Sequence, residues 1–270
     1  MLIPSIDLMG GRIVQLVHGE TLKLAFDDFE YWIGRFQNYP LVQLIDLDAA
    51  MRKGENGDLI TRIAKRLPCQ VGGGIATAEK AAAVLSAGAR RVIVGSALFG
   101  GANLVNTEFA RSLAAAVGLE QLVFSVDTKQ GRVAVKGWKD QVKLTPEEAI
   151  PQLEPYCGAF LYTHIDREGT MQGFPIEVAH RLKQKTRRQL IVAGGIREQA
   201  EIDALDEIGV DAVAGMAVYS GILATLSGLC FEESELQIPP LRYPGFPVEL
   251  SGFRELHAAF FAESRTRGPV

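Results

Sequence analysis

Two aspartates, Asp7 and Asp127, have the residue type and spacing that most clearly suggest chemistry. They lie 120 positions apart, and each is the third residue of a Ser-x-Asp triplet that begins at Ser5 or Ser125. Two carboxylates can divide the work of a general acid and a general base when their surroundings hold their pKa values apart. A single aspartate after a strand is more often a turn or helix cap, but a repeated one favours catalysis.

Paired glycines also occur twice, in VGGGI (71–75) and in VAGGI (192–196). Glycine allows backbone N–H groups to approach an anion closely, and helix N-termini favour phosphate. We therefore expect two phosphate sites, although the same glycines could form tight turns and nothing more. The residues assigned to these sites are Gly73, Gly74, Gly95, Ser96, Gly194, Gly195, Gly215 and Met216.

Four further residues are candidates for contact with a ligand. Thr163 and His164 end a strand-like run, and Glu168 follows in the next loop. Thr163 could bond a substrate, whereas His164 could equally be an ordinary loop residue. Trp138 follows a predicted hairpin, where it could stack on a planar ring or simply pack against its neighbours.

Other polar residues suggest structure rather than chemistry. Asp46 and Asp48 are interpreted as caps of the turn after a strand. His18, His180 and His257 are scattered through the chain and show no metal-ligand spacing. The sequence therefore predicts no metal site.

Eight strand-like runs can position these residues, and helical patterns separate most of them. The runs cover residues 2–7, 41–46, 69–72, 91–95, 122–127, 159–164, 190–194 and 211–215. Continuous apolar runs are typical of parallel strands covered on both faces. Thr77 and Thr145 are predicted helix N-caps, the second with a capping box to Glu148. This α/β pattern predicts a (β/α)8 TIM barrel. The alternative, an open doubly wound sheet, would normally show a GxGxxG turn after its first strand.

The second half of the chain repeats the first. IVGSALF (93–99) corresponds to VAGMAVY (213–219), and IDLDAA (45–50) corresponds to IDREGT (165–170). With the aspartates and the paired glycines, four elements recur in the same order, which predicts two similar half-barrels. We expect the barrel to span residues 1–230 and residues 231–270 to form a C-terminal extension packed on it.

Composition limits the classes of function. The chain has 270 residues, of which 47% are hydrophobic, and a net charge of −4. These values are typical of a soluble globular protein and give no basic surface for nucleic acid. No apolar run is long enough to span a membrane, and the first residues lack a signal peptide's features. Three widely spaced cysteines fit reduced thiols, so we expect a cytoplasmic protein.

The quoted motifs together resemble one known family. IPSIDLMGGRIVQLVHG (3–19), VGGGI, VDTKQGRVAVKGW (126–138), THIDREGT (163–170) and VAGMAVYSG (213–221) are similar to the ribotide isomerase family of histidine biosynthesis. The resemblance covers residues 1 to about 225. It implies a usually monomeric barrel without metal or organic cofactor, which rearranges an aminoaldose to an aminoketose on a substrate with a phosphate at each end.

The resemblance also implies roles for single residues. Asp7 would be the general base that takes a proton from C2 of the opened ribose, and Asp127 the general acid that protonates the ring oxygen. We therefore expect the surroundings of Asp127 to raise its pKa and those of Asp7 to keep it ionised. The candidate substrate contacts are Gln15, Trp138, Thr163, His164 and Glu168, and the glycine turns would hold the phosphates.

Three positions depart from the usual pattern. Bacterial members carry Arg at the position of Gln15 and Asp at that of Glu168, and an Arg after the first glycine turn, where this chain has Ala76. Gln15 and Glu168 resemble the fungal form of the isomerase. A related substrate or second activity stays open, as do two alternatives: the sister cyclase of the pathway, and a barrel that binds a sugar phosphate without catalysis.

Overall fold

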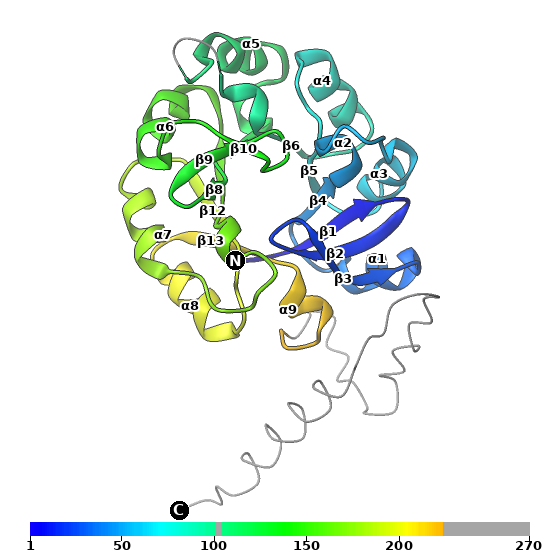
Figure 1. Ribbon diagram of the computed structural model, residues 1–270. Helices are drawn as coiled ribbons and strands as arrows, with labels where there is room; N and C mark the ends of the chain where they lie inside the picture. Colours follow the sequence, from blue (N-terminus) through cyan, green and yellow to red (C-terminus); the bar gives the residue numbers. More distant parts are fainter. Residues whose placement is uncertain (101–103, 224–270) are drawn as a thin grey trace, which may run out of the picture. The chain divides into compact units, whose positions relative to one another are not determined.

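The computed structural model describes residues 1–100 and 104–223, and within them eight parallel strands close into a barrel (Figure 1). Neighbouring strands follow chain order, and the last pairs with the first, so that Leu2 lies opposite Ala212. The barrel strands are β1 (Leu2–Met9), β4 (Val42–Asp46), β5 (Cys69–Gly72), β6 (Arg91–Val94), β7 (Leu122–Ser125), β11 (Ala159–Thr163), β12 (Gln189–Ala193) and β13 (Val210–Ala214). This closure confirms the predicted (β/α)8 barrel and excludes the open sheet.

Helices surround the barrel and connect its strands (Figure 1). The α-helices are α1 (Phe29–Phe36), α2 (Leu47–Ala50), α3 (Gly57–Ala64), α4 (Ala78–Ser86), α5 (Thr107–Val117), α6 (Pro146–Leu153), α7 (Ile176–Lys183), α8 (Gln199–Glu207) and α9 (Met216–Tyr219). The 3-10 helices are η1 (Ser96–Leu98), η2 (Leu119–Gln121), η3 (Glu154–Tyr156) and η4 (Ile165–Arg167). Thr77 caps α4, and Thr145 forms the predicted capping box with Glu148. Such caps contribute about 0.5–2 kcal/mol because they satisfy unpaired N–H groups.

Side chains along each strand alternate between the inside and the outside of the barrel. In β1, Ile3 belongs to the apolar cluster that fills the inside, whereas Ile6 and Leu8 belong to the larger cluster between strands and helices. The same alternation directs Ser5 and Asp7 inward. The alternation along β1 therefore points the serine and the aspartate of the Ser-x-Asp triplet toward the barrel axis.

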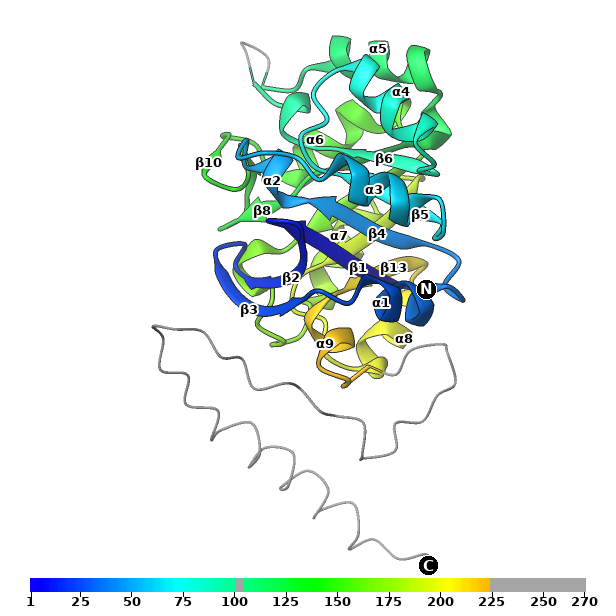
Figure 2. The same cartoon turned by 90° about the vertical axis from the view of Figure 1, so that its right-hand side faces the viewer.

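Two antiparallel additions lie at the mouth, the end of the barrel at which the eight strands stop (Figure 2). β2 (Arg12–Val17) and β3 (Thr21–Phe26) form a hairpin that extends β1. β8 (Thr128–Lys129), β9 (Arg132–Val135) and β10 (Asp140–Gln141) form a small sheet after β7, where the sequence predicts a hairpin. Both additions lie where they can contact a ligand bound in the mouth.

The two halves share backbone geometry at the repeated glycines. Gly73 has φ 111° and its counterpart Gly194 has φ 103°. Gly95 precedes η1 with φ −122° and ψ −97°, and Gly215 precedes α9 with φ −108° and ψ −83°. This agreement supports the predicted repeat, and superposition of the complete halves stays a prediction.

One part of the chain for which the sequence makes a prediction is not described by the structure. The expected C-terminal extension at 231–270 lies outside them. Among the residues that the structure does describe, no helix is both long and apolar enough to cross a membrane.

Candidate active site

Asp7 and Asp127 lie at the mouth on strands that face each other across the barrel. Asp7 is in β1, and Asp127 follows the end of β7 by two residues. In each half the serine of the triplet donates a hydrogen bond to the aspartate, and both distances from Oγ to Oδ1 are 2.7 Å. Sequence analysis noted the repeated Ser5 and Ser125 but gave them no role. The Ser-x-Asp repeat was the signal for it, because residues two apart in a strand share one face.

The two carboxylates differ in how many donors they have. Burial raises the pKa of Asp7 to about 6, opposed by the hydrogen bond from Ser5. Burial also raises the pKa of Asp127, but hydrogen bonds from Ser125, Trp138 and Thr163 oppose it. The pKa of Asp7 therefore lies above the ordinary value in the free protein, because one donor does not offset its burial. A pKa near 6 still leaves Asp7 mostly ionised at pH 7, and strengthens it as a base.

Glu168 brings a third carboxylate to the mouth. It follows η4, and burial together with the charges of Asp7 and Asp127 raises its pKa to about 8. Glu168 is therefore mainly protonated at neutral pH. The resemblance implies that Glu168 is a substrate contact, but no sequence pattern predicts that it lies near both aspartates. Within the described part of the chain, no group of three or more His, Cys, Asp or Glu side chains could hold a metal ion.

Replacing Glu168 by Gln is expected to stabilise the protein at alkaline pH. The pKa of Glu168 is about 8 in the folded state, against 4.5 for an ordinary glutamate. Its contribution to folding is fully present below pH 4.5 and is lost as pH rises through 8. The Gln variant should therefore unfold at nearly the wild-type temperature at pH 5 and several degrees above it at pH 8.5.

Thermal unfolding at both pH values checks this expectation. Glu177→Gln is the matched control, because Glu177 is exposed in the first turn of α7. A melting temperature of the Glu168 variant below that of wild type at pH 8.5 would show that the carboxylate is stabilised rather than strained.

Trp138 holds Asp127 directly. Its indole N–H donates to Oδ2 of Asp127 over 2.9 Å. The indole also lies against the β2–β3 hairpin, since a Cβ added to Gly19 would be 2.6 Å from Cε3 of Trp138. Sequence analysis offered stacking on a ligand ring or simple packing. The structure shows a third role, a hydrogen bond to the carboxylate of Asp127. Stacking on a ligand ring stays a prediction.

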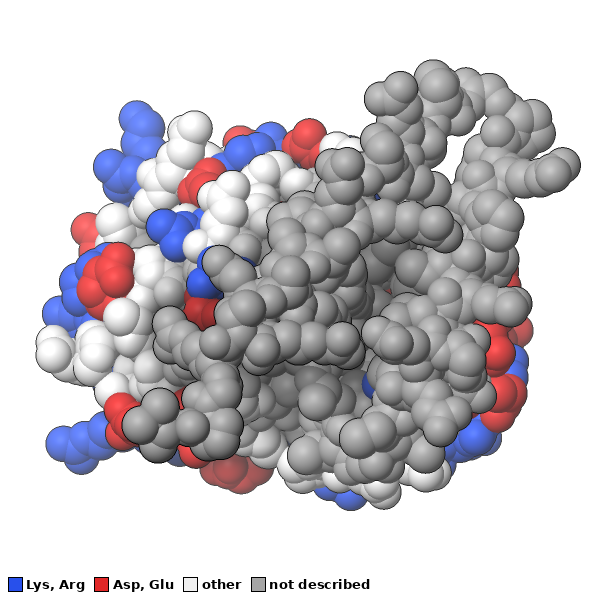
Figure 3. Space-filling view, turned by 90° about the horizontal axis from the view of Figure 1, so that it is seen from below, with Lys and Arg blue, Asp and Glu red and all other residues white. Residues whose placement is uncertain are grey.

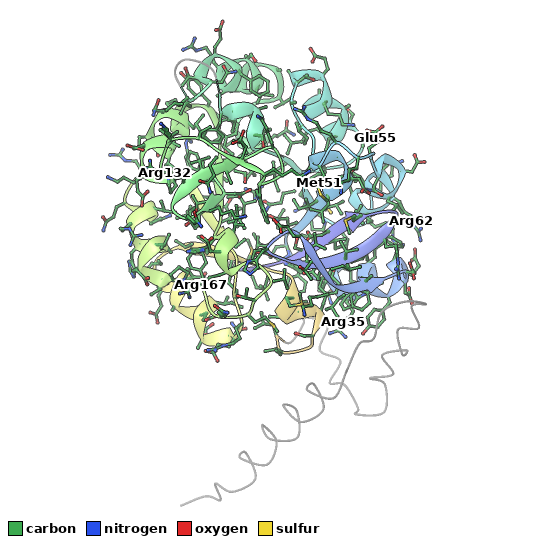
Figure 4. The ribbon with its side chains drawn as sticks, in the orientation of Figure 1. Arg35, Met51, Glu55, Arg62, Arg132 and Arg167 are labelled. Carbon is green, nitrogen blue, oxygen red and sulfur yellow. The ribbon has the colours of Figure 1, made fainter. Side chains whose placement is uncertain are left out.

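The loop that carries Trp138 extends across the mouth to other elements. The backbone N–H of Lys136 donates to Oγ of Ser96 over 2.8 Å. A Cβ added to Gly137 would be 3.3 Å from the carbonyl oxygen of Ala50. Next to Ala50, Met51 lies beside the mouth, whereas Arg62 on α3 lies toward the outside (Figure 4). The loop therefore connects Asp127 with the turn after β6 and with α2.

Thr163 and His164 lie on opposite sides of β11. Leu161 belongs to the cluster inside the barrel, so Thr163, two residues later, also points inward, and it is buried. His164 is two residues after Tyr162 and therefore lies on the same, outer face of the strand. Its ring packs edge-on against Tyr162 and Phe174 outside the barrel. The structure thus retains Thr163 as a candidate contact. It contradicts the assignment of His164, because alternation along the strand turns this side chain away from the mouth.

Gln15 lies at the turn after β13. Its side chain is buried, with Nε2 donating to the carbonyl oxygen of Val14 over 2.8 Å. The carboxamide oxygen lies against Gly215, where an added Cβ would collide with it. Gln15 therefore occupies the position from which it can contact a ligand at this turn.

The paired glycines have structural reasons of their own. Gly73 and Gly194 have positive φ, and an added Cβ would collide with the backbone of Asp46 or His164. Gly195 has φ 90°, and its added Cβ would be 2.8 Å from the carbonyl oxygen of Gly173. These turns need glycine whether or not a phosphate binds, so glycine identity alone is weak evidence for phosphate. Phosphate binding at the turns stays a prediction.

Asp46 and Asp48 both have structural roles, but only Asp46 forms the predicted cap after the strand. Asp46 caps α2 by accepting from the N–H of Ala49, and it also accepts from the backbone N–H of Asn56. Asp48 accepts from the N–H of Gly10 over 2.7 Å. Both carboxylates are occupied in holding loops at the mouth.

Known proteins are similar to this chain in sequence over the barrel. A family model described as histidine biosynthesis protein matches residues 1–224. The chain is 35% identical over 230 residues to a protein of Methanocaldococcus jannaschii, covering 83% of this chain and 95% of that protein. It is 30% identical over 241 residues to a protein of Methanothermobacter thermautotrophicus, covering 86% and 99%. Both relatives are named 1-(5-phosphoribosyl)-5-((5-phosphoribosylamino)methylideneamino) imidazole-4-carboxamide isomerase. Since the family match spans all eight strands of the barrel and both aspartates, the chain belongs to the histidine biosynthesis protein family.

Proposed function

We propose that this protein is the isomerase of histidine biosynthesis that rearranges a bis-phosphorylated ribotide from an aminoaldose to an aminoketose. The observation that carries the proposal is the pair of serine-supported aspartates on opposite walls of the mouth. The names of the relatives support the isomerase over the cyclase. The intact pair also favours an enzyme over a barrel that only binds a sugar phosphate.

The proposed reaction begins with opening of the ribose ring. Asp127 in its protonated form gives its proton to the ring oxygen, and the C1–O bond breaks as the nitrogen lone pair forms a C=N bond to C1. Asp7 then removes the proton from C2, so that the C–H electrons form a C1=C2 bond and the C=N electrons return to nitrogen. A proton added to C1, with loss of the C2 hydroxyl proton, gives the ketone. Atoms and charge balance without an external oxidant or reductant.

The surroundings of the two aspartates support this division of labour in the bound state. The free mouth contains Asp7, Asp127 and Glu168, and a bound phosphate would raise the pKa of each carboxylate further. If Trp138 leaves Asp127 to stack on the substrate ring, Asp127 also loses a donor that stabilises its anion. Both changes favour protonated Asp127 at the moment an acid is needed.

We propose that the substrate lies across the mouth with one phosphate at each pair of glycine turns. The turns after β5 and β6 and those after β12 and β13 lie in opposite halves of the barrel. Thr163 and Glu168 would contact the reacting sugar between them, and Gln15 would contact the phosphate at the turn of Gly215. Gln15 offers a neutral hydrogen bond where bacterial members of the family usually carry Arg, a difference of roughly 1 kcal/mol.

Nothing in the composition of the chain calls for a macromolecular partner. We propose a cytoplasmic enzyme that acts as a monomer on this small molecule, without nucleic acid or membrane. The net charge of −4 supports the absence of a nucleic-acid partner. Lys and Arg intermingle with Asp and Glu where the described surface is visible from below (Figure 3).

Complementation tests the proposed function. The gene is expected to restore growth without histidine to a strain that lacks this isomerase. Purified protein should also convert the bis-phosphate substrate to the aminoketose. Failure to complement with the protein present and folded would remove the proposal. Binding by titration calorimetry without turnover would favour the non-catalytic barrel.

A further inference from the structure

Asp166, in η4, holds the tip of the hairpin that follows Asp127, a contact that the proposed mechanism does not use. Oδ2 of Asp166 accepts a hydrogen bond from the backbone N–H of Gln130 over 2.8 Å. Gln130 and Gly131 form the two-residue turn between β8 and β9. The bond therefore joins the loop after β11 to the loop after β7 at the tip of the β8–β9 hairpin.

The turn at this tip needs support from its surroundings. Both turn residues have a positive φ, 51° for Gln130 and 74° for Gly131. Hairpin turns of this type favour Asn-Gly or Gly-Gly, so a glutamine at the first position carries backbone strain. Such strain persists where other contacts fix the backbone, and the bond to Asp166 is one such contact.

The first half of the barrel contains the same contact. The backbone N–H of Gly10, three residues after Asp7, donates to Oδ2 of Asp48 over 2.7 Å. Gln130 likewise stands three residues after Asp127, and each accepting aspartate lies in the loop after the neighbouring barrel strand, β4 or β11. The contact thus recurs beside both aspartates of the mouth, which is not expected of an incidental surface bond.

The loop that contains Asp166 also carries Glu168 and is held from its other side by the β2–β3 hairpin. The backbone N–H of His18 donates to the carbonyl oxygen of Glu168 over 3.0 Å. Nδ1 of His18 lies 3.1 Å from the carbonyl oxygen of Ile165. Hairpins from both halves of the barrel therefore bind this loop, and Asp166 supplies a side-chain contact on the side of Asp127.

The β8–β9 hairpin is in turn bonded to Asp127 itself. The backbone N–H of Ala134, in β9, donates to the carbonyl oxygen of Asp127 over 2.8 Å. Trp138, which follows β9, donates from its indole N–H to Oδ2 of Asp127 over 2.9 Å. A shift of the hairpin would therefore move both the backbone and the carboxylate of Asp127.

We propose that Asp166 is a positioning residue, whose carboxylate fixes the β8–β9 hairpin against η4 and so sets Asp127 and Glu168 in place relative to each other. The bond is a feature of the structure, whereas its importance for turnover rests on the proposed function, in which Asp127 is the acid. Asp166 itself takes no part in proton transfer.

Turnover of two variants at this position is the first test. Asp166→Ala is expected to lower kcat about 10-fold, since a misplacement on the order of 1 Å can cost up to about 100-fold. Asp166→Asn should stay within about twofold of wild type, because its amide oxygen can accept the same N–H.

Glu154→Ala is the matched control for a lost bond between loops. Glu154 also accepts from a backbone N–H, that of Arg187 over 2.6 Å, but it precedes β11 and so lies at the end of the barrel opposite the mouth. Both Ala variants should melt below the wild-type temperature. Glu154→Ala should keep wild-type kcat, which separates positioning from a general loss of stability.

The indole N–H signal of Trp138 in NMR reports on the hairpin without substrate. The chain has two tryptophans, and the signal is assigned by its loss in Trp138→Phe. Asp166→Ala should shift this signal and make its N–H exchange with water several-fold faster, because the bond to Asp127 opens more often. Asp166→Asn and Glu154→Ala should leave the signal unchanged.

Either an unmoved Trp138 signal or an unchanged kcat in Asp166→Ala overturns the proposal. An Asn variant as slow as the Ala variant also overturns it, because loss of the accepted bond would not be the cause. An Asp166→Ala variant that fails to fold has the same consequence, since the carboxylate would then support the whole barrel.

The two measurements keep this proposal separate from the proposed function. If the wild type neither complements nor turns over, the proposed function falls, and the Trp138 signal decides whether Asp166 fixes the hairpin. If the wild type is active and Asp166→Ala equals it, the proposed function stands and the role of Asp166 falls.

Discussion

Asp7→Asn and Asp127→Asn are each expected to lower kcat by at least 100-fold, while KM changes little. Asn keeps the shape of the side chain and its bond to the serine, but it cannot take or give the proton. General acid–base catalysis contributes about 10²–10⁴-fold, and each variant should lose an amount in this range. Steady-state turnover of the bis-phosphate substrate measures the loss.

Asp58→Asn is the control for these variants, because Asp58 is exposed in the first turn of α3. It should keep wild-type turnover. Thermal unfolding should show that both mouth variants stay folded. Because burial raises the pKa of both carboxyls, their removal should stabilise the protein at alkaline pH. If either variant retained more than a tenth of wild-type kcat, that aspartate would be structural.

The second large effect is expected at the turns proposed to hold phosphate. Ser96→Glu and Met216→Glu each place a carboxylate at the first residue of the short helix at one turn. At about 5 Å and an effective dielectric constant of about 20, two unit charges repel by roughly 3 kcal/mol. Each variant should therefore raise KM on the order of 100-fold, with a smaller change in kcat.

The control for charge is Gln184→Glu, at an exposed position after α7. It adds the same net charge but should leave KM unchanged. Substitution of Gly195 is a poorer test, because its backbone and the nearby Gly173 exclude a side chain. An unchanged KM in both turn variants would place the phosphates elsewhere and leave the glycines as tight turns.

Much of the fold could be predicted because it depends on local patterns. The caps at Thr77 and Thr145 reflect interactions between residues close in the chain. The apolar runs and the repeat can be read directly from the sequence. The inward direction of Asp7 follows from strand parity. The position of its partner Asp127 follows from the eightfold alternation of strand and helix, which sets strands one and five opposite each other.

The remainder of the site depends on contacts between loops. Glu168, in the loop after η4, lies near enough to Asp7 and Asp127 for their charges to raise its pKa. Trp138 donates to Asp127 from a separate loop, and its ring also lies against Gly19. No local pattern encodes these approaches. Thr163 and His164 are neighbours in the sequence, which suggested a shared role. Consecutive side chains of a strand point to opposite faces, however, so the position of both residues in or next to β11 already predicts that His164 and Thr163 point in opposite directions.

The alkaline side of the pH profile has two candidate groups. Asp127 must be protonated to act as the acid, and Glu168, whose pKa is about 8, also loses a proton in this range. Their effects are separated by comparing Asp127→Asn with Glu168→Gln. We expect the alkaline limb to report Asp127 in the substrate complex.

The pH dependence of kcat in wild type, Asp7→Asn and Asp127→Asn tests most directly whether the two aspartates share the work as base and acid. We expect a bell-shaped profile for wild type, because one group must be ionised and the other protonated. The residual activity of Asp7→Asn should lose the acidic limb, and that of Asp127→Asn the alkaline limb. If both limbs survived in either variant, or if the alkaline limb disappeared only in Glu168→Gln, the two aspartates would not be the base and the acid.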